Sequence, residues 1–315
     1  MLDGKHIAVV VPAYDEASLL PQTLAGIPSF VDRVYVVDDA STDDTAERAR
    51  AAAANDPRIE VILHEKNAGV GAAIVSGYRR AVEERVDVTC VMAADNQMDP
   101  GELRELVEPV ARGEVEYAKA NRLVSGEAWK VIPRTRYLGN AVLSLLTKIA
   151  SGYWHVADSQ AGYTALSLTA LRRVELAELY PRYGFPNDML VHLNVENARV
   201  RDVPSRPIYD VGEQSGIRLR SVVPRISWLL LKGFWWRMGQ KYVIRDFHPL
   251  VFFYAFGALM LTVGFVLGLI ELLLRIAGNA ITPATIVLVA VLLIAGLQMT
   301  LFAMWFDMEA NKDLR

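Results

Sequence analysis

Four clusters of polar residues follow four apolar runs in the first hundred residues, and they are well suited to binding a charged substrate. In chain order they read Pro12-Ala-Tyr-Asp-Glu16, Asp38-Asp-Ala-Ser-Thr-Asp43, Asn67-Ala-Gly-Val-Gly71 and Asp95-Asn-Gln-Met-Asp-Pro100. One such cluster is usually only a turn. Carboxylates and amides after four successive runs suit a nucleotide and a hard divalent metal ion. A redox cofactor is disfavoured, because Ile74 stands where a dinucleotide fingerprint needs its third glycine.

The apolar runs that carry these clusters are predicted to be buried strands. They cover residues 7–11, 34–37, 59–63 and 86–92, and helical patterns at 17–26, 42–54, 71–82 and 100–112 alternate with them. This alternation predicts a doubly wound α/β sheet. Ligands of such sheets bind beyond the carboxyl ends of the strands, where the four clusters are placed. Cys90, the only cysteine, lies in the fourth run and is expected to be a core thiol.

The C-terminal quarter of the sequence has the composition of a membrane anchor. Glu271 is the only charge between residues 250 and 274, and residues 281–306 are uncharged. Runs of this length cross a hydrocarbon layer as helices. We expect a hairpin over residues 248–307, with spans at about 249–275 and 281–306 and a tail at 308–315. Glu271 and Gln298 are costly in lipid and should pair, either across the hairpin or within a homo-oligomer.

Residues 217–247, just before the hairpin, mix basic and aromatic side chains. Their cations are Arg218, Arg220, Arg225, Lys232, Arg237, Lys241 and Arg245. This composition is typical of amphipathic helices in a membrane interface, where cations suit anionic headgroups. An ordinary amphipathic helix packed on the domain is the alternative. The loop between the spans offers only Arg275, so the positive-inside rule places the N-terminal domain and both termini in the cytoplasm.

Two further features bound the prediction. Residues 1–6 are polar and a strand follows at once, so no signal peptide is expected. The formal net charge is −3, which gives no indication of nucleic-acid binding.

Taken in order, the motifs resemble those of family 2 glycosyltransferases with the GT-A fold. The resemblance lies in Val10-Val-Pro-Ala-Tyr-Asp-Glu16, Val37-Asp-Asp-Ala-Ser-Thr-Asp43, Asn67-Ala-Gly-Val-Gly71, Met92-Ala-Ala-Asp-Asn-Gln-Met-Asp-Pro100 and Asp158-Ser-Gln-Ala-Gly-Tyr-Thr-Ala165. With two C-terminal spans, the chain is similar to the polyprenyl-phosphate glycosyltransferases, which include the dolichol-phosphate mannose synthases. The resemblance implies a Rossmann-like GT-A catalytic domain over residues 1–216.

The resemblance also implies a donor site. Its nucleotide-binding positions correspond to Pro12, Tyr14, Glu16, Asp38, Asp39, Asn67 and Gly71. Asp95 and Gln97 match the ligands of a divalent metal, Mg²⁺ or Mn²⁺, which would neutralise the leaving diphosphate. Ala93 occupies the first aspartate position of the family's metal motif and Asn96 replaces a small residue, so weaker metal binding is expected.

On the acceptor side, the resemblance implies that arginines bind a lipid phosphate. The candidates are Arg122, Arg134 and Arg136, followed by Ser215 and Arg218 in a later loop. The planar fork of arginine suits phosphate oxygens. Asp158 and Asp188 join Asp95 as candidate catalytic residues and are the candidate bases. A phosphate monoester is already anionic near neutral pH and needs orientation more than deprotonation. Holding a sugar hydroxyl and orienting an arginine are therefore alternatives to the role of base for either aspartate.

The function expected from this resemblance is inverting transfer of one sugar from a nucleotide sugar to polyprenyl or dolichyl phosphate at the cytoplasmic membrane face. UDP-glucose or UDP-N-acetylglucosamine is favoured as donor, with GDP-mannose as the alternative. A processive polysaccharide synthase is a rival, but such enzymes usually carry a Gln-x-x-Arg-Trp element and more spans. A non-catalytic nucleotide-sugar-binding scaffold is a second rival, motivated by Ala93.

Overall fold

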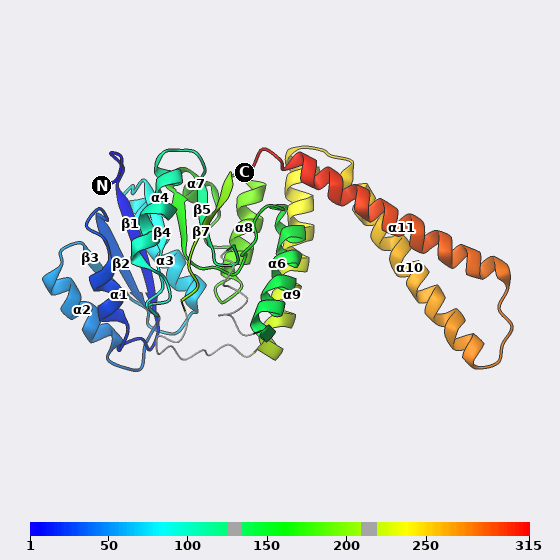
Figure 1. Cartoon of the computed structure of the whole chain (residues 1–315), viewed down its shortest axis with the longest axis horizontal. Coiled ribbons are helices and arrows are strands. Elements are labelled where there is room, and N and C mark those ends of the chain that lie inside the picture. The colour runs from blue at the N-terminus through cyan, green and yellow to red at the C-terminus, as the bar shows by residue number, and fades with distance from the viewer. Residues whose placement is uncertain (125–133, 209–218) are drawn as a thin grey trace. The chain divides into compact units, whose positions relative to one another are not determined.

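The computed structural model describes residues 1–124, 134–208 and 219–315. The chain forms two compact units (Figure 1). The first comprises Met1–Phe234 together with Asp313–Arg315, and the second comprises Trp235–Lys312.

A seven-stranded sheet forms the centre of the first unit. Its strands are β1 (Ile7–Ala13), β2 (Arg33–Asp38), β3 (Ile59–Leu63), β4 (Val88–Val91), β5 (Tyr117–Asn121), β6 (Thr164–Ser167) and β7 (Val200–Pro204), in the order β3-β2-β1-β4-β6-β5-β7. The first four strands are parallel, as predicted, but β6 runs antiparallel to both β4 and β5. A buried strand reads as the same apolar run in either direction, so the apolar pattern does not reveal this reversal.

Helices cover both faces of the sheet. They are α1 (Leu20–Gly26), α2 (Thr45–Asn55), α3 (Val70–Glu83), η1 (Pro100–Glu102), α4 (Leu103–Ala111), α6 (Arg134–Ser151), α7 (Leu168–Arg173) and α8 (Phe185–Val195). Alternate residues of β1 point to opposite faces, as the strand period of two requires. Val9 packs in the cluster that contains α1 and α4, and Val10 packs in the cluster that contains α3 and α8.

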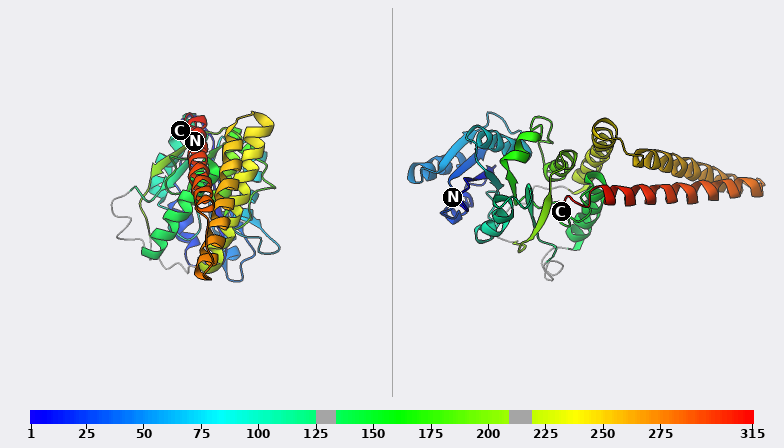
Figure 2. Two further views of the ribbon diagram at one scale, coloured as in Figure 1. Left: turned by 90° about the vertical axis from the view of Figure 1, so that its right-hand side faces the viewer. Right: turned by 90° about the horizontal axis from the view of Figure 1, so that it is seen from above.

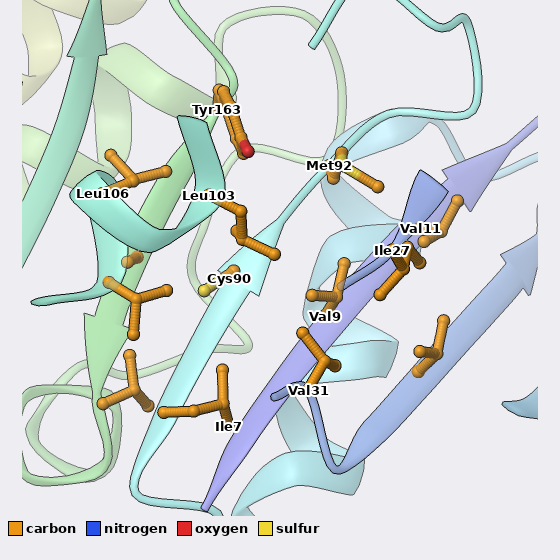
Figure 3. Packing of buried hydrophobic residues seen from close by; sticks show 14 of the residues in the cluster. Ile7, Val9, Val11, Ile27, Val31, Cys90, Met92, Leu103, Leu106 and Tyr163 are labelled. Atoms are coloured by element: carbon orange, nitrogen blue, oxygen red, sulfur yellow. The ribbon is translucent and has the colours of Figure 1, made fainter. Parts of the chain in front are cut away.

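Close packing fixes the position of the sheet against its helices. Figure 3 shows the α4 side, where Val9 and Met92 lie near Leu103 in a continuous apolar layer. Cys90 is fully buried in this layer, and burial raises the pKa of its thiol, which confirms the predicted core role. On the opposite face, a Cβ at Gly77 of α3 would lie 2.4 Å from Val10 Cγ1, so only glycine allows this helix to approach β1 so closely.

The strand directions bring the loops to one edge of the sheet. Ala13, Asp38 and Leu63 are aligned at the carboxyl ends of β1, β2 and β3. Because β6 is antiparallel, it begins at the same edge, where Thr164 pairs with Val91 and with Lys119. The loops that follow β1 to β5 and the loop that precedes β6 therefore all lie at this edge.

Two long apolar helices dominate the second unit. The helix α9 (Leu219–Gly239) enters this unit and continues into a π-helical segment, η2 (Gln240–Arg245), before α10 (Leu250–Ile276) and α11 (Pro283–Ala310). Both long helices are apolar enough to span a membrane, as predicted. They lie side by side in both views of Figure 2. A Cβ at Gly257 would lie 3.1 Å from Gly296 O, so small residues allow the close approach.

The hairpin geometry settles one expectation about its polar residues. Gly268 of α10 faces Val289, whereas Gly257 faces Gly296. At a rise of about 1.5 Å per residue, Glu271 and Gln298 therefore lie about 18 Å apart along the hairpin. The two side chains do not pair with each other, and their pairing within a homo-oligomer stays a prediction.

A buried ion pair joins the end of α9 to the end of α11, and it corrects the interpretation of two basic residues. Arg237 donates to both oxygens of Asp307, at 2.8 and 2.9 Å, and neither side chain is exposed. The Tyr242 hydroxyl also donates to Asp307, at 2.8 Å, while Lys241 Nζ donates to Asn311 Oδ1 at 2.8 Å. Arg237 and Lys241 are thus buried within the second unit, and the expectation that they contact lipid headgroups is wrong.

We predict that Asp307→Ala strongly destabilises the protein, because it leaves the Arg237 guanidinium buried without its carboxylate. Breaking such a pair costs about 3–5 kcal/mol. The measurement is the thermal unfolding midpoint of the detergent-solubilised chain. The control is the double variant Arg237→Met with Asp307→Leu, which removes both charges and should recover most of the midpoint, since Asn311 still donates to the Tyr242 hydroxyl. A double variant as unstable as the single one would contradict this role for the pair.

Candidate active site

The loops after β1 and β2 are bonded to each other and form the first wall of the site. Asp15 Oδ1 accepts a hydrogen bond from Thr42 N at 2.7 Å, and Glu16 N donates to Thr45 Oγ1 at 2.9 Å. Pro12 is buried beneath these loops, Glu16 is partly buried, and Tyr14 is 45% exposed. The predicted nucleotide-binding residues of this segment therefore come together at the edge of the sheet, with the Tyr14 ring at the surface.

Asp39 lies at the centre of the donor side, and its carboxylate is fully engaged. It is 2% exposed and accepts hydrogen bonds from Ala68 N at 2.9 Å and Gly69 N at 2.7 Å. His64 Nδ1 donates to the same carboxylate at 2.7 Å. Asp39 was expected to contact the nucleotide. Its hydrogen bonds also hold the 67–69 loop in place, and its role in nucleotide binding stays a prediction.

His64 is a residue whose contribution the sequence analysis missed. Its second ring nitrogen, Nε2, lies 2.9 Å from Ser76 Oγ on α3. Ser76, His64 and Asp39 thus form a chain from a rigid helix to the loop. The position of His64 could have indicated this contribution, because the residue directly follows the strand β3 at the edge where the other polar clusters lie.

The remaining donor residues line the same loops. Asp38 is 4% exposed and accepts a hydrogen bond from the Ser41 hydroxyl. Asn67 is exposed, and its amide donates to Asp39 O at 3.4 Å. Both residues lie where the sequence placed them, at the strand ends.

Gly71 has a packing role in addition to the predicted nucleotide-binding role. A Cβ at Gly71 would lie 2.5 Å from Tyr180 O, and a Cβ at Gly69 would lie 2.5 Å from Pro181 O. Asp188 supports this neighbouring segment, because its carboxylate accepts a hydrogen bond from Tyr180 N at 2.8 Å. Burial raises the pKa of Asp188, against the opposing effect of His192. This hydrogen bond supports a positioning role for Asp188, and its role as a base stays a prediction.

Arg122 and Asp158, two of the residues predicted for the acceptor side and for catalysis, form an ion pair. Arg122 Nε lies 2.8 Å from Asp158 Oδ2, and its NH2 group lies 3.2 Å from Oδ1. The side chain of Asp158 is 1% exposed and that of Arg122 is 24% exposed. Burial raises the pKa of Asp158, but the charge and hydrogen bonds of Arg122 and the charge of Lys119 outweigh it and lower the pKa overall. These contacts support the role of Asp158 as a carboxylate that orients an arginine, which is one of the roles expected for it.

Two amides connect the Asp158 loop to the helices behind it. Gln160 Nε2 donates to Asn187 Oδ1 at 2.7 Å, and Thr147 of α6 donates to the same oxygen at 2.9 Å. Asn187 is fully buried at the start of α8. Asn187 directly precedes the predicted Asp188, and it is the Asn187 amide that contacts the Asp158 loop through Gln160. No motif in the sequence indicates this contact.

The predicted metal ligands Asp95 and Gln97 lie in a tight turn after β4. Asp95 Oδ1 accepts a hydrogen bond from Gln97 N at 3.1 Å, and Asn96 between them has a φ of 57°. Carboxylate and amide oxygens are the donors that Mg²⁺ and Mn²⁺ accept. Among the residues that the structure describes, no three His, Cys, Asp or Glu side chains gather in a group that could hold a metal. The donor set therefore fits a cation shared with substrate phosphates rather than one caged by protein alone.

Four predicted acceptor residues are not tested by these contacts. Arg134 and Arg136 begin α6, but their side chains lie outside the described part of the chain. Ser215 and Arg218 likewise lie outside the described residues.

We predict that Asp39→Ala weakens nucleotide binding at least about tenfold, because the buried amides of Ala68 and Gly69 lose their acceptor. His64→Ala, which leaves those two hydrogen bonds intact, should cost less. Calorimetric titration of both variants with UDP and GDP measures the effect. Unchanged affinity for both nucleotides in Asp39→Ala would remove Asp39 from the donor site.

Comparison with known proteins places this geometry in a family. The glycosyl transferase family 2 domain matches residues 8–174. A UDP-N-acetylglucosamine–dolichyl-phosphate N-acetylglucosaminyltransferase of Methanococcus voltae is 28% identical over 65% of this chain and 86% of its own length. An undecaprenyl-phosphate mannosyltransferase of Micrococcus luteus is 32% identical over 63% of this chain and 82% of its own.

A solved structure supports the fold. Glucosyl-3-phosphoglycerate synthase of Mycobacterium tuberculosis, crystallised with Mn²⁺, UDP and glucosyl-3-phosphoglycerate, superposes with a TM-score of 0.55 and 21% identity. The match covers 75% of this chain and 81% of that one, and it confirms the GT-A fold. With the family domain matched across β1 to β6 and the fold shared, this chain belongs to glycosyl transferase family 2.

Proposed function

We propose that this protein transfers a single sugar from a nucleotide sugar to a polyprenyl or dolichyl phosphate at the membrane surface. The observation that carries the proposal is the position of the Arg122–Asp158 pair at the same sheet edge as the donor loops, in a chain with two span-length apolar helices. The relatives support it, because those of Methanococcus voltae and Micrococcus luteus are named for transfer to dolichyl and undecaprenyl phosphate.

The residues of this chain position two anions for one displacement. The donor loops hold the nucleotide against the edge of the sheet, while the Arg122 guanidinium, whose Nε and NH2 groups are held by Asp158, binds the lipid phosphate. Asp158 keeps that guanidinium oriented and takes up no proton, because a phosphate monoester attacks as an anion. Asp95 and Gln97 would hold a divalent cation, which would supply charge neutralisation for the leaving diphosphate. A single in-line attack inverts the anomeric centre.

The sugar donor is a finer part of the proposal. UDP-glucose or UDP-N-acetylglucosamine is the first choice, and GDP-mannose is the alternative. The relatives support both, since one is named for a UDP-sugar and two, from Micrococcus luteus and Mycolicibacterium smegmatis, are named for mannose transfer. A donor that binds raises the unfolding midpoint by mass action, so a thermal screen of the three nucleotide sugars separates them.

The proposed location is the cell membrane, with the catalytic domain and both termini in the cytoplasm. The apolar face of α9 supports a membrane contact, because Trp228 and Leu231 are 58% and 49% exposed and lie three residues apart on one face. The two rival functions gain no support. The described part of the chain has two span-length helices, which suits an anchor better than the channel of a processive synthase. The hypothesis of a non-catalytic scaffold does not explain why the Arg122–Asp158 ion pair lies beside the donor loops.

We predict that Asp95→Ala lowers transfer at least about a hundredfold while the thermal midpoint changes little, because Asp95 is the only carboxylate of the metal-binding pair. The assay follows label from each nucleotide sugar into lipid extract, with undecaprenyl phosphate as acceptor and Mg²⁺ or Mn²⁺ present. Asp99→Ala is the matched control, since its carboxylate accepts a hydrogen bond from Gly101 N in the same loop, and it should lose far less. Near-native activity of Asp95→Ala in Mn²⁺ would contradict the metal assignment.

We predict that Trp228→Ser with Leu231→Ser slows transfer to undecaprenyl phosphate in vesicles several-fold more than transfer to a short, water-soluble prenyl phosphate. The polar side chains weaken docking to the bilayer, which the soluble acceptor does not need. Trp228→Phe with Leu231→Met keeps the apolar face and should retain both rates. Equal losses for both acceptors would show that this face supports the fold and not membrane docking.

A further inference from the structure

Lys119 is a buried cation that neither the motifs nor the proposed reaction accounts for. It lies on β5, is 0% exposed, and its Nζ donates to Ala161 O in the loop that follows Asp158. It is paired in register with Asp202 on β7 and with Thr164 on β6. Lysines are almost never fully buried unless their charge is compensated.

Three other charged groups surround this ammonium. The paired Asp158 and Arg122 both act on its charge, and Asp202 is its register partner on the neighbouring strand. Asp202 Oδ2 accepts hydrogen bonds from Asn121 Nδ2 and Ala157 N, both at 2.7 Å. Its other oxygen is buried and has no hydrogen-bond partner within the described residues. Two cations and two carboxylates thus form a cluster with no net charge.

The charge balance matters because Arg122 is the cluster's exposed member. A lipid phosphate brings about 1.5 to 2 negative charges. If Lys119 were neutral, Asp158 and Asp202 together would outweigh Arg122, and the cluster would repel the phosphate. A neutral side chain could donate the same hydrogen bond to Ala161 O. This hydrogen bond alone therefore does not explain why a charged lysine occupies position 119.

We propose that Lys119 is a positioning residue for the acceptor: its buried charge offsets one of the two carboxylates, so that the cluster around Arg122 stays neutral and does not repel the lipid phosphate. This inference rests on the proposed function. It concerns acceptor binding alone and leaves the donor loops unaffected.

The pH dependence follows from the same groups. Burial lowers the pKa of Lys119 to about 8, with Arg122 lowering it further and Asp158 and Asp202 raising it. Lys119 therefore carries its charge below pH 8 and loses it as the pH rises through 8. The acceptor KM of the wild-type protein should rise across this range, while the donor KM stays flat.

The test compares four full-length proteins: wild type, Lys119→Met, Asp202→Asn and the double variant. Transfer to undecaprenyl phosphate in detergent micelles gives the KM for acceptor and donor between pH 6.5 and about 9. We expect Lys119→Met to raise the acceptor KM about tenfold or more, with an unchanged donor KM and no inflection near pH 8. The double variant removes one charge of each sign and should return the acceptor KM to within about threefold of wild type.

The outcomes separate this inference from a structural role and from the proposed function. If Lys119 only holds the Ala161 loop, the double variant stays as impaired as Lys119→Met, and this overturns the inference. A wild-type acceptor KM in Lys119→Met overturns it as well. If Lys119→Met does not fold, the pH profile of the wild-type protein tests the inference. An acceptor KM that stays constant as the pH rises through 8 would then overturn it. Absence of sugar transfer by the wild-type protein would instead refute the proposed function.

Discussion

A charge removed from water needs a partner, and this constraint determines most of the functional architecture of the chain. Asp39 is buried and accepts hydrogen bonds from His64 and two loop amides. Asp158 is buried and forms an ion pair with Arg122. Asp307 is buried in the second unit and forms an ion pair with Arg237. Each carboxylate fixes a different element: the donor loop, the acceptor arginine and the end of α9.

The sheet brings the first two of these arrangements together. Parallel strands direct the donor loops to one edge, and the reversed β6 brings the Asp158 loop to the same edge beside the end of β5. In the proposed mechanism these buried acids take up no proton. They make the loops and the arginine rigid, which suits a reaction between two anions that depends on orientation and charge more than on proton transfer.

The sequence predicts the elements and motif positions well, because both are local properties. The strand at 59–63 is observed with these bounds, and the two spans begin within two residues of the expected positions. The partners of the buried acids are not local. His64 lies 25 residues from Asp39, and Arg237 lies 70 residues from Asp307. Composition therefore suggested headgroup contacts for Arg237, and the family resemblance implied a nucleotide-binding role for Asp39, which stays a prediction. Only the folded chain shows the groups with which these two charges pair.

The anomeric configuration and mass of the lipid product test the proposed mechanism most directly. Nuclear magnetic resonance and mass spectrometry can determine both after turnover of the full-length protein with undecaprenyl phosphate and an α-linked nucleotide sugar. Direct attack by a phosphate oriented by Arg122 predicts one sugar per lipid in the β configuration. A retained α linkage would contradict the single displacement. A lipid that carries several sugars would contradict the transfer of one sugar per lipid.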